Sequence, residues 1–229
     1  TLVMLDDGRV SAERRAGASA SYLNPFALEA VEVVRGPGSV AYGSDALGGI
    51  VHARTPMPEP GVLGFRYRFS AGTGGSPEAT GGVGLNVPAG PAAFSLNLYQ
   101  RSQGDYESPA GTQDNSAVRD RGFVLRGLVP VGEARLWASF QLDQVRDMGK
   151  PQADLPTTRT FYPEEDSSRF ALGLDVPGVA GFSSLELRAF LGDYGIVTNR
   201  QRVPSETTTL RNALSDVDAK DYSVRLLGR

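Results

Sequence analysis

The chain has 229 residues, with 23 basic and 26 acidic side chains and a formal net charge of −3 at pH 7. This balance argues against nucleic acid as a partner, because phosphate backbones attract strongly basic proteins. The sequence has no cysteine and one histidine, His52. It therefore excludes disulfides and thiolate catalysis, and it argues against a cysteine-built or histidine-built metal centre.

The first seven residues lack the basic start and the apolar run that mark a secretory signal. No apolar run approaches the roughly 20 residues of a membrane helix. Transmembrane β-strands leave no such run, because they alternate apolar and polar residues over about ten positions. The pattern of alternation along the chain is therefore the feature to examine.

The first 56 residues predict a small α/β head. Residues 2–5 form a short apolar run that ends in an Asp-Asp-Gly turn, as a strand does. Asn24 and Pro25 suit the cap and the first position of a short helix. Residues 31–34 are rich in valine and residues 50–55 follow the same pattern, so two further strands are expected.

A proline-rich segment follows the head. Residues 56–60 contain three prolines, which continue neither a helix nor a central strand. We therefore expect three parts: residues 1–56 as the head, residues 57–62 as a linker, and residues 63–229 as a β-domain.

After the linker the hydrophobic pattern has a period of two. Phe65, Tyr67 and Phe69 share one face of the first predicted strand, and Arg66 and Arg68 share the other. The same alternation recurs along the chain, and it predicts eight strands at about 64–71, 79–87, 94–99, 121–129, 135–143, 168–176, 184–191 and 220–228.

The connections between these strands are sorted by length. Three short ones open with Val-Pro and contain glycine, as turns do. Between them lie long polar connections at residues 104–120, 146–167 and 196–219. Short turns at one end and long loops at the other are typical of an outer-membrane barrel. Strand by strand, a soluble antiparallel sheet with one face on a core gives the same alternation, so both interpretations stay open.

Membrane energetics assign the faces if the sheet lies in lipid. An arginine facing lipid at the midplane costs about 2 to 4 kcal/mol. The aromatic face of residues 65–69 would then look outward, and Arg66 and Arg68 would look inward.

The head contains the stretch RGPGSVAYGSDALGG at residues 35–49. A phosphate-binding loop needs Gly-Lys-Ser/Thr at its end, which is absent, and a dinucleotide fingerprint needs a third glycine that is missing from its place. The stretch LEAVEVVRGP, followed by YGSDALGGIV, resembles the plug-domain signature of the TonB-dependent outer-membrane receptors. The signature residues here are Arg35, Gly36, Pro37, Tyr42, Gly43, Gly48 and Gly49.

The resemblance implies a mainly β fold: part of a transmembrane antiparallel barrel, about eight strands of 22, preceded by the end of the α/β plug. It implies a monomeric transporter in the outer membrane of a Gram-negative bacterium, with no catalytic residues and no cofactor. Its partners would be outer-membrane lipid, TonB through a segment missing from this chain, and a scarce ligand such as an iron chelate, haem, cobalamin or a glycan. On this interpretation the chain is a fragment, and the glycines permit close packing of the plug backbone inside the barrel.

The polar stretch at residues 9–24 is the expected ligand contact. Its candidates are Arg14, Arg15, Tyr22 and Asn24, and its arginines suit an anionic chelate. The alternative is that these arginines are solvated or pair with acidic barrel residues.

Charged residues on the head and on the inward face are candidates for ion pairs between plug and barrel: Glu32, Arg35, Arg66, Arg68, Glu186 and Arg188. Such pairs would hold the plug yet let it rearrange, and simple structural pairing is the alternative. His52 is interpreted as a strand residue with a hydrogen-bond partner.

A second function class is also consistent with the sequence. A secreted or surface-attached β-rich module that binds a ligand, for example a carbohydrate, would carry the same alternation. It differs from a transporter in being soluble in buffer.

Overall fold

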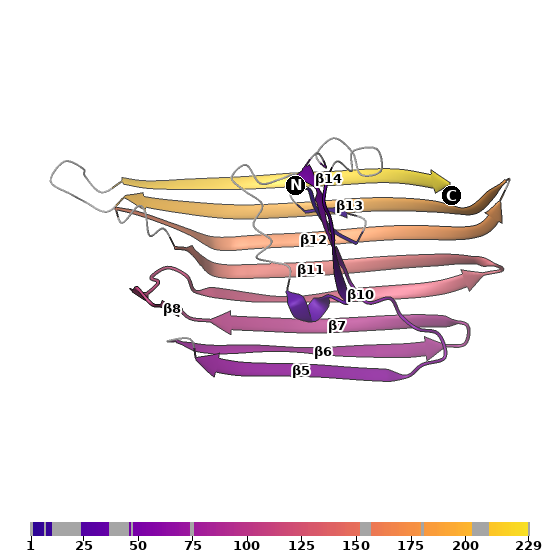
Figure 1. The fold of residues 1–229 in the computed structure, drawn as a ribbon, viewed down its shortest axis with the longest axis horizontal. Coiled ribbons are helices and arrows are strands. Elements are labelled where there is room, and N and C mark those ends of the chain that lie inside the picture. Colours follow the sequence, from indigo (N-terminus) through magenta and orange to yellow (C-terminus); the bar gives the residue numbers. More distant parts are fainter. Residues whose placement is uncertain are drawn as a thin grey trace.

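The structure is a computed structural model of the chain. It describes residues 2–6, 8–10, 24–36, 46, 48–73, 76–151, 157–179, 181–202 and 211–228. These residues form a small sheet near the N-terminus, here called the head, and a large sheet, here called the long sheet (Figure 1). Within these ranges no helix is long and apolar enough to cross a membrane.

The head is a four-stranded sheet in the order β2-β1-β4-β3. Strand β1 pairs in parallel with β4, while β2 and β3 pair antiparallel with β1 and β4. The strands are β1 (Leu2–Leu5), β2 (Gly8–Arg9), β3 (Ala30–Val34) and β4 (Ile50–Arg54). The bounds of β1, β3 and β4 agree with the runs predicted from the sequence, whereas β2 was not predicted.

The helix predicted after Asn24 is a single 3₁₀ turn, η1 (Pro25–Ala27). Asn24 caps it, because its side chain accepts a hydrogen bond from the Phe26 N–H at 3.0 Å, and Pro25 occupies the first position. Leu28 is already extended, with φ −99° and ψ 143°, so the turn does not continue into an α-helix.

The long sheet contains the eight predicted strands in the order β14-β13-β12-β11-β10-β7-β6-β5, with all neighbours antiparallel. Their bounds are β5 (Gly64–Thr73), β6 (Pro77–Ala89), β7 (Ala92–Gln103), β10 (Val118–Val131), β11 (Ala134–Lys150), β12 (Thr158–Val179), β13 (Phe182–Arg202) and β14 (Arg211–Gly228). A small hairpin, β8 (Glu107–Ser108) and β9 (Gly111–Thr112), lies in the connection between β7 and β10.

Two of the three long connections predicted from the sequence are mostly strand. Residues 146–167 contain the end of β11 and the start of β12, and residues 196–219 contain the end of β13 and the start of β14. The prediction of long loops there was wrong, because polar residues and a register shift between Phe161 and Glu164 interrupt the regular alternation, while backbone pairing continues.

The short turns lie together at one end of the sheet, as predicted. Figure 1 places the turns β6–β7 and β10–β11 at the same end of the sheet, and the hairpin β8–β9 at the opposite end. The short turns contain Gly90 at φ 62° and Gly132 at φ 63°. This left-handed conformation suits glycine and makes a tight reversal inexpensive.

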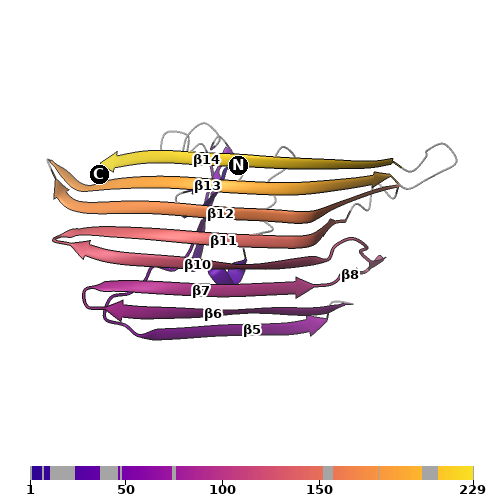
Figure 2. The same ribbon diagram turned by 180° about the vertical axis from the view of Figure 1, so that it is seen from behind.

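The head packs on one face of the long sheet, with its strands crossing those of the sheet steeply (Figure 1). Figure 2, from behind, shows the other face of the sheet free of the head. The shared core cluster takes Val3, Leu5, Val10 and Ala53 from the head and Val118, Val145, Met148 and Tyr194 from the sheet. The face that carries this cluster is called inward below.

The outward face is apolar. Phe65, Tyr67 and Phe69 are 67%, 70% and 71% exposed, and Leu98, Leu125, Phe170, Leu191 and Val224 are among the exposed apolar side chains on the later strands. On the inward face, Arg66 donates a hydrogen bond to Asn97 Oδ1 at 3.0 Å, and the Arg68 guanidinium lies 5.6 Å from the ring centroid of Phe26. The aromatic residues and the arginines of β5 therefore face as the sequence predicted.

Candidate functional site

One buried ion pair joins the head to the long sheet. Asp6 directly follows β1 and has φ 51°, and its Oδ2 lies 2.6 Å from Nη2 of Arg126 on β10. The two side chains are 13% and 3% exposed. Thr55 completes the junction: its N–H donates to Asp6 Oδ1 and its hydroxyl to Asp6 Oδ2, both at 2.9 Å, and its carbonyl accepts from Arg126 Nη1 at 3.1 Å. The ends of β1 and β4 are thus fixed to β10.

Trp137 on β11 extends this junction across the sheet. The Arg126 guanidinium lies 5.2 Å from its ring centroid, and that of Arg188 on β13 lies 5.4 Å from it. Arg188 forms ion pairs with Asp175 and, at 3.2 Å, with Glu186. Cation–π contacts gain strength in desolvated surroundings, so the buried indole links two charged groups that do not touch.

A cavity of about 560 Å³ lies between the head and the sheet beside this junction. Its head side includes Glu29, His52 and Arg54, and its sheet side includes Arg126, Trp137, Asp175, Glu186, Arg188 and Arg225. Charges of both signs line it. Between the head and this part of the inward face there is therefore a polar cavity. The interface between them is not continuously apolar.

A second polar contact attaches the η1 end of the head. Asn24 is 1% exposed, and its Nδ2 donates to Asp120 Oδ2 on β10 at 2.9 Å. Asp120 also pairs with Arg101 on β7 at 2.5 Å. The structure thus places Asn24 as a helix cap and an anchor, buried under the head. The other ligand candidates, Arg14, Arg15 and Tyr22, lie outside the described residues.

The candidates for ion pairs between head and sheet are distributed differently from the prediction. Glu32 pairs with Arg54 at 2.8 Å inside the head, with both side chains 50% exposed, and Arg35 is exposed. Glu186 and Arg188 pair with each other on β13. Arg66 and Arg68 make the contacts with Asn97 and Phe26 described above.

Sequence analysis missed Asp6 and Arg126. A usable signal existed for Arg126, because it is a cation at an inward position of a strand whose inward neighbours Val124 and Leu128 are apolar. Nothing local pointed to Asp6 as its partner.

The glycine-rich stretch is described only in part. Gly36 and Gly49 have φ 98° and φ 114°. A Cβ at Gly49 would lie 2.7 Å from the carbonyl oxygen of Val34, so close backbone approach requires glycine there. Gly48 is exposed, and Pro37, Tyr42 and Gly43 lie outside the described residues.

The β7–β10 connection is ordered by Asp105 and Asn115. Asp105 Oδ1 accepts hydrogen bonds from the N–H groups of Ser116 at 2.7 Å and Ala117 at 2.8 Å. Desolvation, the largest single influence, raises the pKa of Asp105, but these hydrogen bonds together bring the pKa below its ordinary value. Asn115 Nδ2 donates to the Thr160 carbonyl at 2.6 Å, which attaches the connection to β12.

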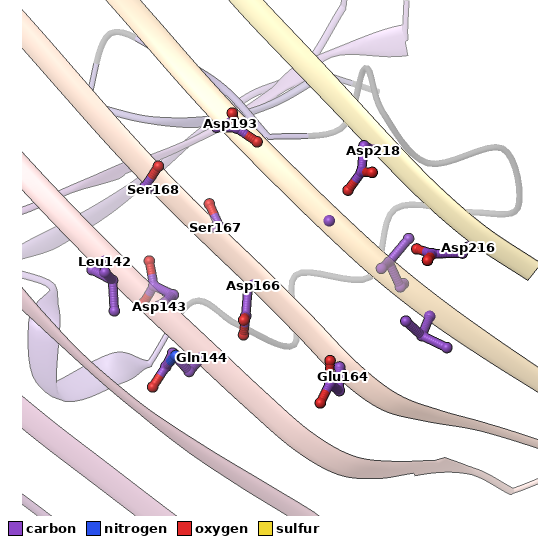
Figure 3. A pocket seen from close by; sticks show the side chains of 13 residues that line it. Leu142, Asp143, Gln144, Glu164, Asp166, Ser167, Ser168, Asp193, Asp216 and Asp218 are labelled. Carbon is purple, nitrogen blue, oxygen red and sulfur yellow. The ribbon is translucent and has the colours of Figure 1, made fainter.

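A groove of about 380 Å³ lies on the outward face, between β11 and β14 (Figure 3). Its acidic side chains are Glu164, Asp166, Asp193, Asp216 and Asp218. Both carboxylate oxygens of Asp166 accept hydrogen bonds from the Arg146 guanidinium. Asp193 Oδ2 lies 3.8 Å from Lys220 Nζ. In the part of the chain that the structure describes, no group of three or more histidine or acidic residues is placed to hold a metal ion.

Comparison with known proteins gives one family. Residues 1–50 match the family model "TonB-dependent Receptor Plug Domain". The chain is 46% identical over 55 residues to the vitamin B12 transporter BtuB of Vibrio vulnificus, and 39% identical over 61 residues to the hemin receptor of Yersinia pestis. Each match covers 24% of this chain and 9% of the relative. These relatives are named as a transporter and a receptor, and neither name is that of an enzyme.

Solved structures match over almost the whole chain. The copper transporter OprC matches 99% of it with a TM-score of 0.80 at 16% identity, and the ferric-catecholate import receptor Fiu of E. coli matches 98% with a TM-score of 0.65 at 14% identity. The matches cover 35% and 38% of those chains. At these identities the likeness shows the fold.

Proposed function

Because residues 1–50 match the plug domain of the TonB-dependent receptors, we propose that the chain is part of an outer-membrane transporter that takes up a scarce ligand with energy supplied through TonB. Residues 1–56 would be the C-terminal part of the plug, residues 57–62 the linker, and residues 63–229 the first strands of the barrel. The protein would be a monomer in the outer membrane of a Gram-negative bacterium, surrounded by lipid.

The outward face of the long sheet carries this proposal. Exposed apolar side chains follow all eight strands, from Phe65 on β5 to Leu226 on β14. A soluble protein rarely exposes an apolar patch of more than a few hundred Å². A secreted ligand-binding module would have to cover this face, whereas outer-membrane lipid covers it directly.

The inward face supports a gated pathway. The head is attached through a few buried polar contacts, chiefly Asp6 with Arg126 and Asn24 with Asp120, and the charged cavity lies beside the first of them. Breaking one buried ion pair costs far more free energy than breaking one exposed pair. A pull on the head would therefore be resisted at a small number of positions.

The test uses the full-length protein in its native host. We expect it to fractionate with outer membranes, to change its gel mobility on boiling, and to support ligand accumulation that stops when TonB is depleted. Recovery in the soluble periplasmic or secreted fraction would contradict the proposal. Uptake that continues without TonB would contradict the proposed energy source but would not contradict the proposed barrel.

The relatives do not fix the ligand, because their names cover vitamin B12, hemin, copper and ferric catecholates. A growth screen with single iron, cobalt or copper sources, comparing a deletion strain with its complemented parent, is the direct way to find it.

A further inference from the structure

A second groove, of about 670 Å³, lies on the outward face over β5, β6 and β7, and it is here called the β5–β7 groove. Ala71, Ala79 and Gly81 form its floor, where small residues leave space. The large side chains of Phe69 and Leu98 border the floor from β5 and β7, and they are 71% and 45% exposed. The groove therefore opens outward. It lies toward the end of the sheet where the hairpin β8–β9 is attached (Figure 2).

The β5–β7 groove becomes polar toward that same end. Gln100 and Ser102 complete its lining on β7. Their register partners on the next strand, β10, are Arg121 and Arg119. Neighbouring strands are about 5 Å apart, so the two arginines lie directly beside the polar end of the groove.

Arg119 and Arg121 face outward and are exposed. Asp120, between them, is buried under the head, so alternation turns its two neighbours to the other face. Arg121 Nε donates to Gln144 Oε1 at 3.0 Å, and Arg119 Nη1 lies 3.8 Å from Asp147 Oδ2 in an exposed pair of little strength. A guanidinium has five N–H donors, so both arginines keep donors for a further acceptor.

The outward charges are divided between two halves of the sheet. In β5, β6, β7 and β10, whose residues are all described, the acidic side chains are Glu78 and Asp120, and both stand at inward positions. The outward carboxylates that line the groove of Figure 3 lie on β12, β13 and β14: Glu164, Asp166, Asp193, Asp216 and Asp218. Arg146 on β11 separates the halves and pairs with Asp166. The half that contains the β5–β7 groove is thus cationic on its outward side.

We propose that the β5–β7 groove and the two arginines form one binding site for a phosphorylated lipid of the outer leaflet, with an acyl chain in the groove and a phosphate at Arg119 and Arg121. This inference rests on the proposed function, which puts lipid against the outward face. The groove is continuous with the apolar band of that face, and its polar end is on the side of the longer connections, which face the cell exterior in such barrels.

The two halves of the site together select the occupant. A soluble anion would bind the arginines but would gain nothing from an apolar groove. A neutral apolar molecule would fill the groove but would leave the arginines unused. A lipid with an anionic headgroup matches both, because a guanidinium offers parallel N–H donors to two phosphate oxygens while the acyl chain covers apolar surface.

The test measures lipid binding to the purified full-length receptor by native mass spectrometry. The phosphorylated probe is lipid A, which carries phosphates and acyl chains. The matched probe is the same lipid after enzymatic removal of its phosphates. Inorganic phosphate serves as a soluble competitor that lacks the acyl chains.

Two variants address the two parts of the site. Arg119→Gln with Arg121→Gln removes the charge, and Ala79→Phe fills the groove with an apolar side chain that lipid tolerates. Their matched controls lie elsewhere on the sheet. Arg135→Gln with Lys220→Gln removes the same charge away from the groove, and Ala189→Phe adds the same ring on β13.

We expect the removal of phosphates from lipid A to lower its binding at least about fivefold. The double arginine variant should lower the binding of lipid A by a similar factor and leave that of the dephosphorylated lipid within about twofold. Ala79→Phe should lower the binding of both lipids, and the two controls should change neither. Inorganic phosphate at the concentration of the lipid should not displace it. Gel mobility that shifts on boiling would show that each variant folds.

Three results would overturn the inference. They are equal binding of the two lipids, equal losses in the double arginine variant and its control, and unchanged binding in Ala79→Phe. In each of these cases uptake that still depends on TonB would leave the proposed function intact. Failure of the wild-type protein to reach the outer membrane would instead overturn both.

Discussion

The head and the long sheet are stabilised by different means. The head has strands of two to five residues and one small core cluster of its own, Leu2, Met4, Ala46 and Ile50. Its other core cluster and its polar anchors are shared with the inward face of the long sheet. The long sheet has strands of 10 to 22 residues joined by continuous backbone pairing. A single side chain should therefore matter to the attachment of the head far more than to the integrity of the sheet.

Cutting the Asp6–Arg126 pair should give the largest effect. Asp6→Ala leaves the Arg126 guanidinium buried without its counter-ion, which costs about 3 to 5 kcal/mol. We expect faster hydrogen exchange in β1 and β4, with β10 to β13 unchanged. Hydrogen exchange with mass spectrometry on the full-length receptor measures both regions at once.

Glu32→Ala is the matched control, since its pair with Arg54 is half exposed and is worth about 0 to 1 kcal/mol. Equal exchange in the two variants would show that the buried pair does not anchor the head.

A charge on the outward face should test the sheet instead of the head. Leu125→Arg puts a cation in place of an exposed apolar side chain that would face lipid in the proposed transporter, at a cost of about 2 to 4 kcal/mol near the midplane. Unfolding in urea from lipid vesicles measures this free energy. Gln144→Arg, next to Arg121 beyond the apolar band, should cost only about 0 to 1 kcal/mol. Similar costs at both positions would mean that lipid does not cover this face.

Two glycine substitutions in the head distinguish the effect of close packing on stability from the effect of backbone strain. Both Gly36 and Gly49 have positive φ, so alanine costs roughly 1 to 2 kcal/mol at either position. Gly49→Ala also drives a methyl group against the Val34 carbonyl, whereas no atom of the described residues lies within 4 Å of a Cβ at Gly36. We expect the thermal stability of the receptor to fall more for Gly49→Ala. A larger fall in thermal stability for Gly36→Ala would show that the contact with the Val34 carbonyl is not what requires glycine in this part of the head.

Acid should loosen the β7–β10 connection before it affects either sheet. The pKa of Asp105 is lower in the folded protein than its ordinary value of 3.8, so its contribution to stability is present above that value. The contribution is lost as the pH falls through the lowered folded-state pKa. Limited proteolysis by pepsin should therefore cut residues 104–117 increasingly at low pH, and Asp105→Asn should allow cutting at pH values where the wild type resists.

The sequence predicts the sheet better than it predicts the contacts of the head. The eight strands are found because an inward polar and an outward apolar face give a period of two, as in Phe65 to Phe69. The full length of β12 is not found, because a register shift between Phe161 and Glu164 breaks the period of two near its start. Asp6 and Arg126 lie 120 positions apart, and no local pattern pairs them. Glu32 was predicted to pair with a charge on the long sheet. It pairs instead with Arg54, which lies on the adjacent strand β4 of the head.

Strand length also has a mechanical consequence. At about 3.3 Å per residue, the 22 residues of β12 extend for roughly 70 Å, about twice the length that a strand tilted by about 45° needs to cross an apolar band of about 25 Å. Much of β12 and β13 would then extend beyond the lipid as a rigid continuation of the barrel wall. A ligand reaching the proposed transporter would then meet a rim of paired strands, whose shape is fixed by their backbone hydrogen bonds.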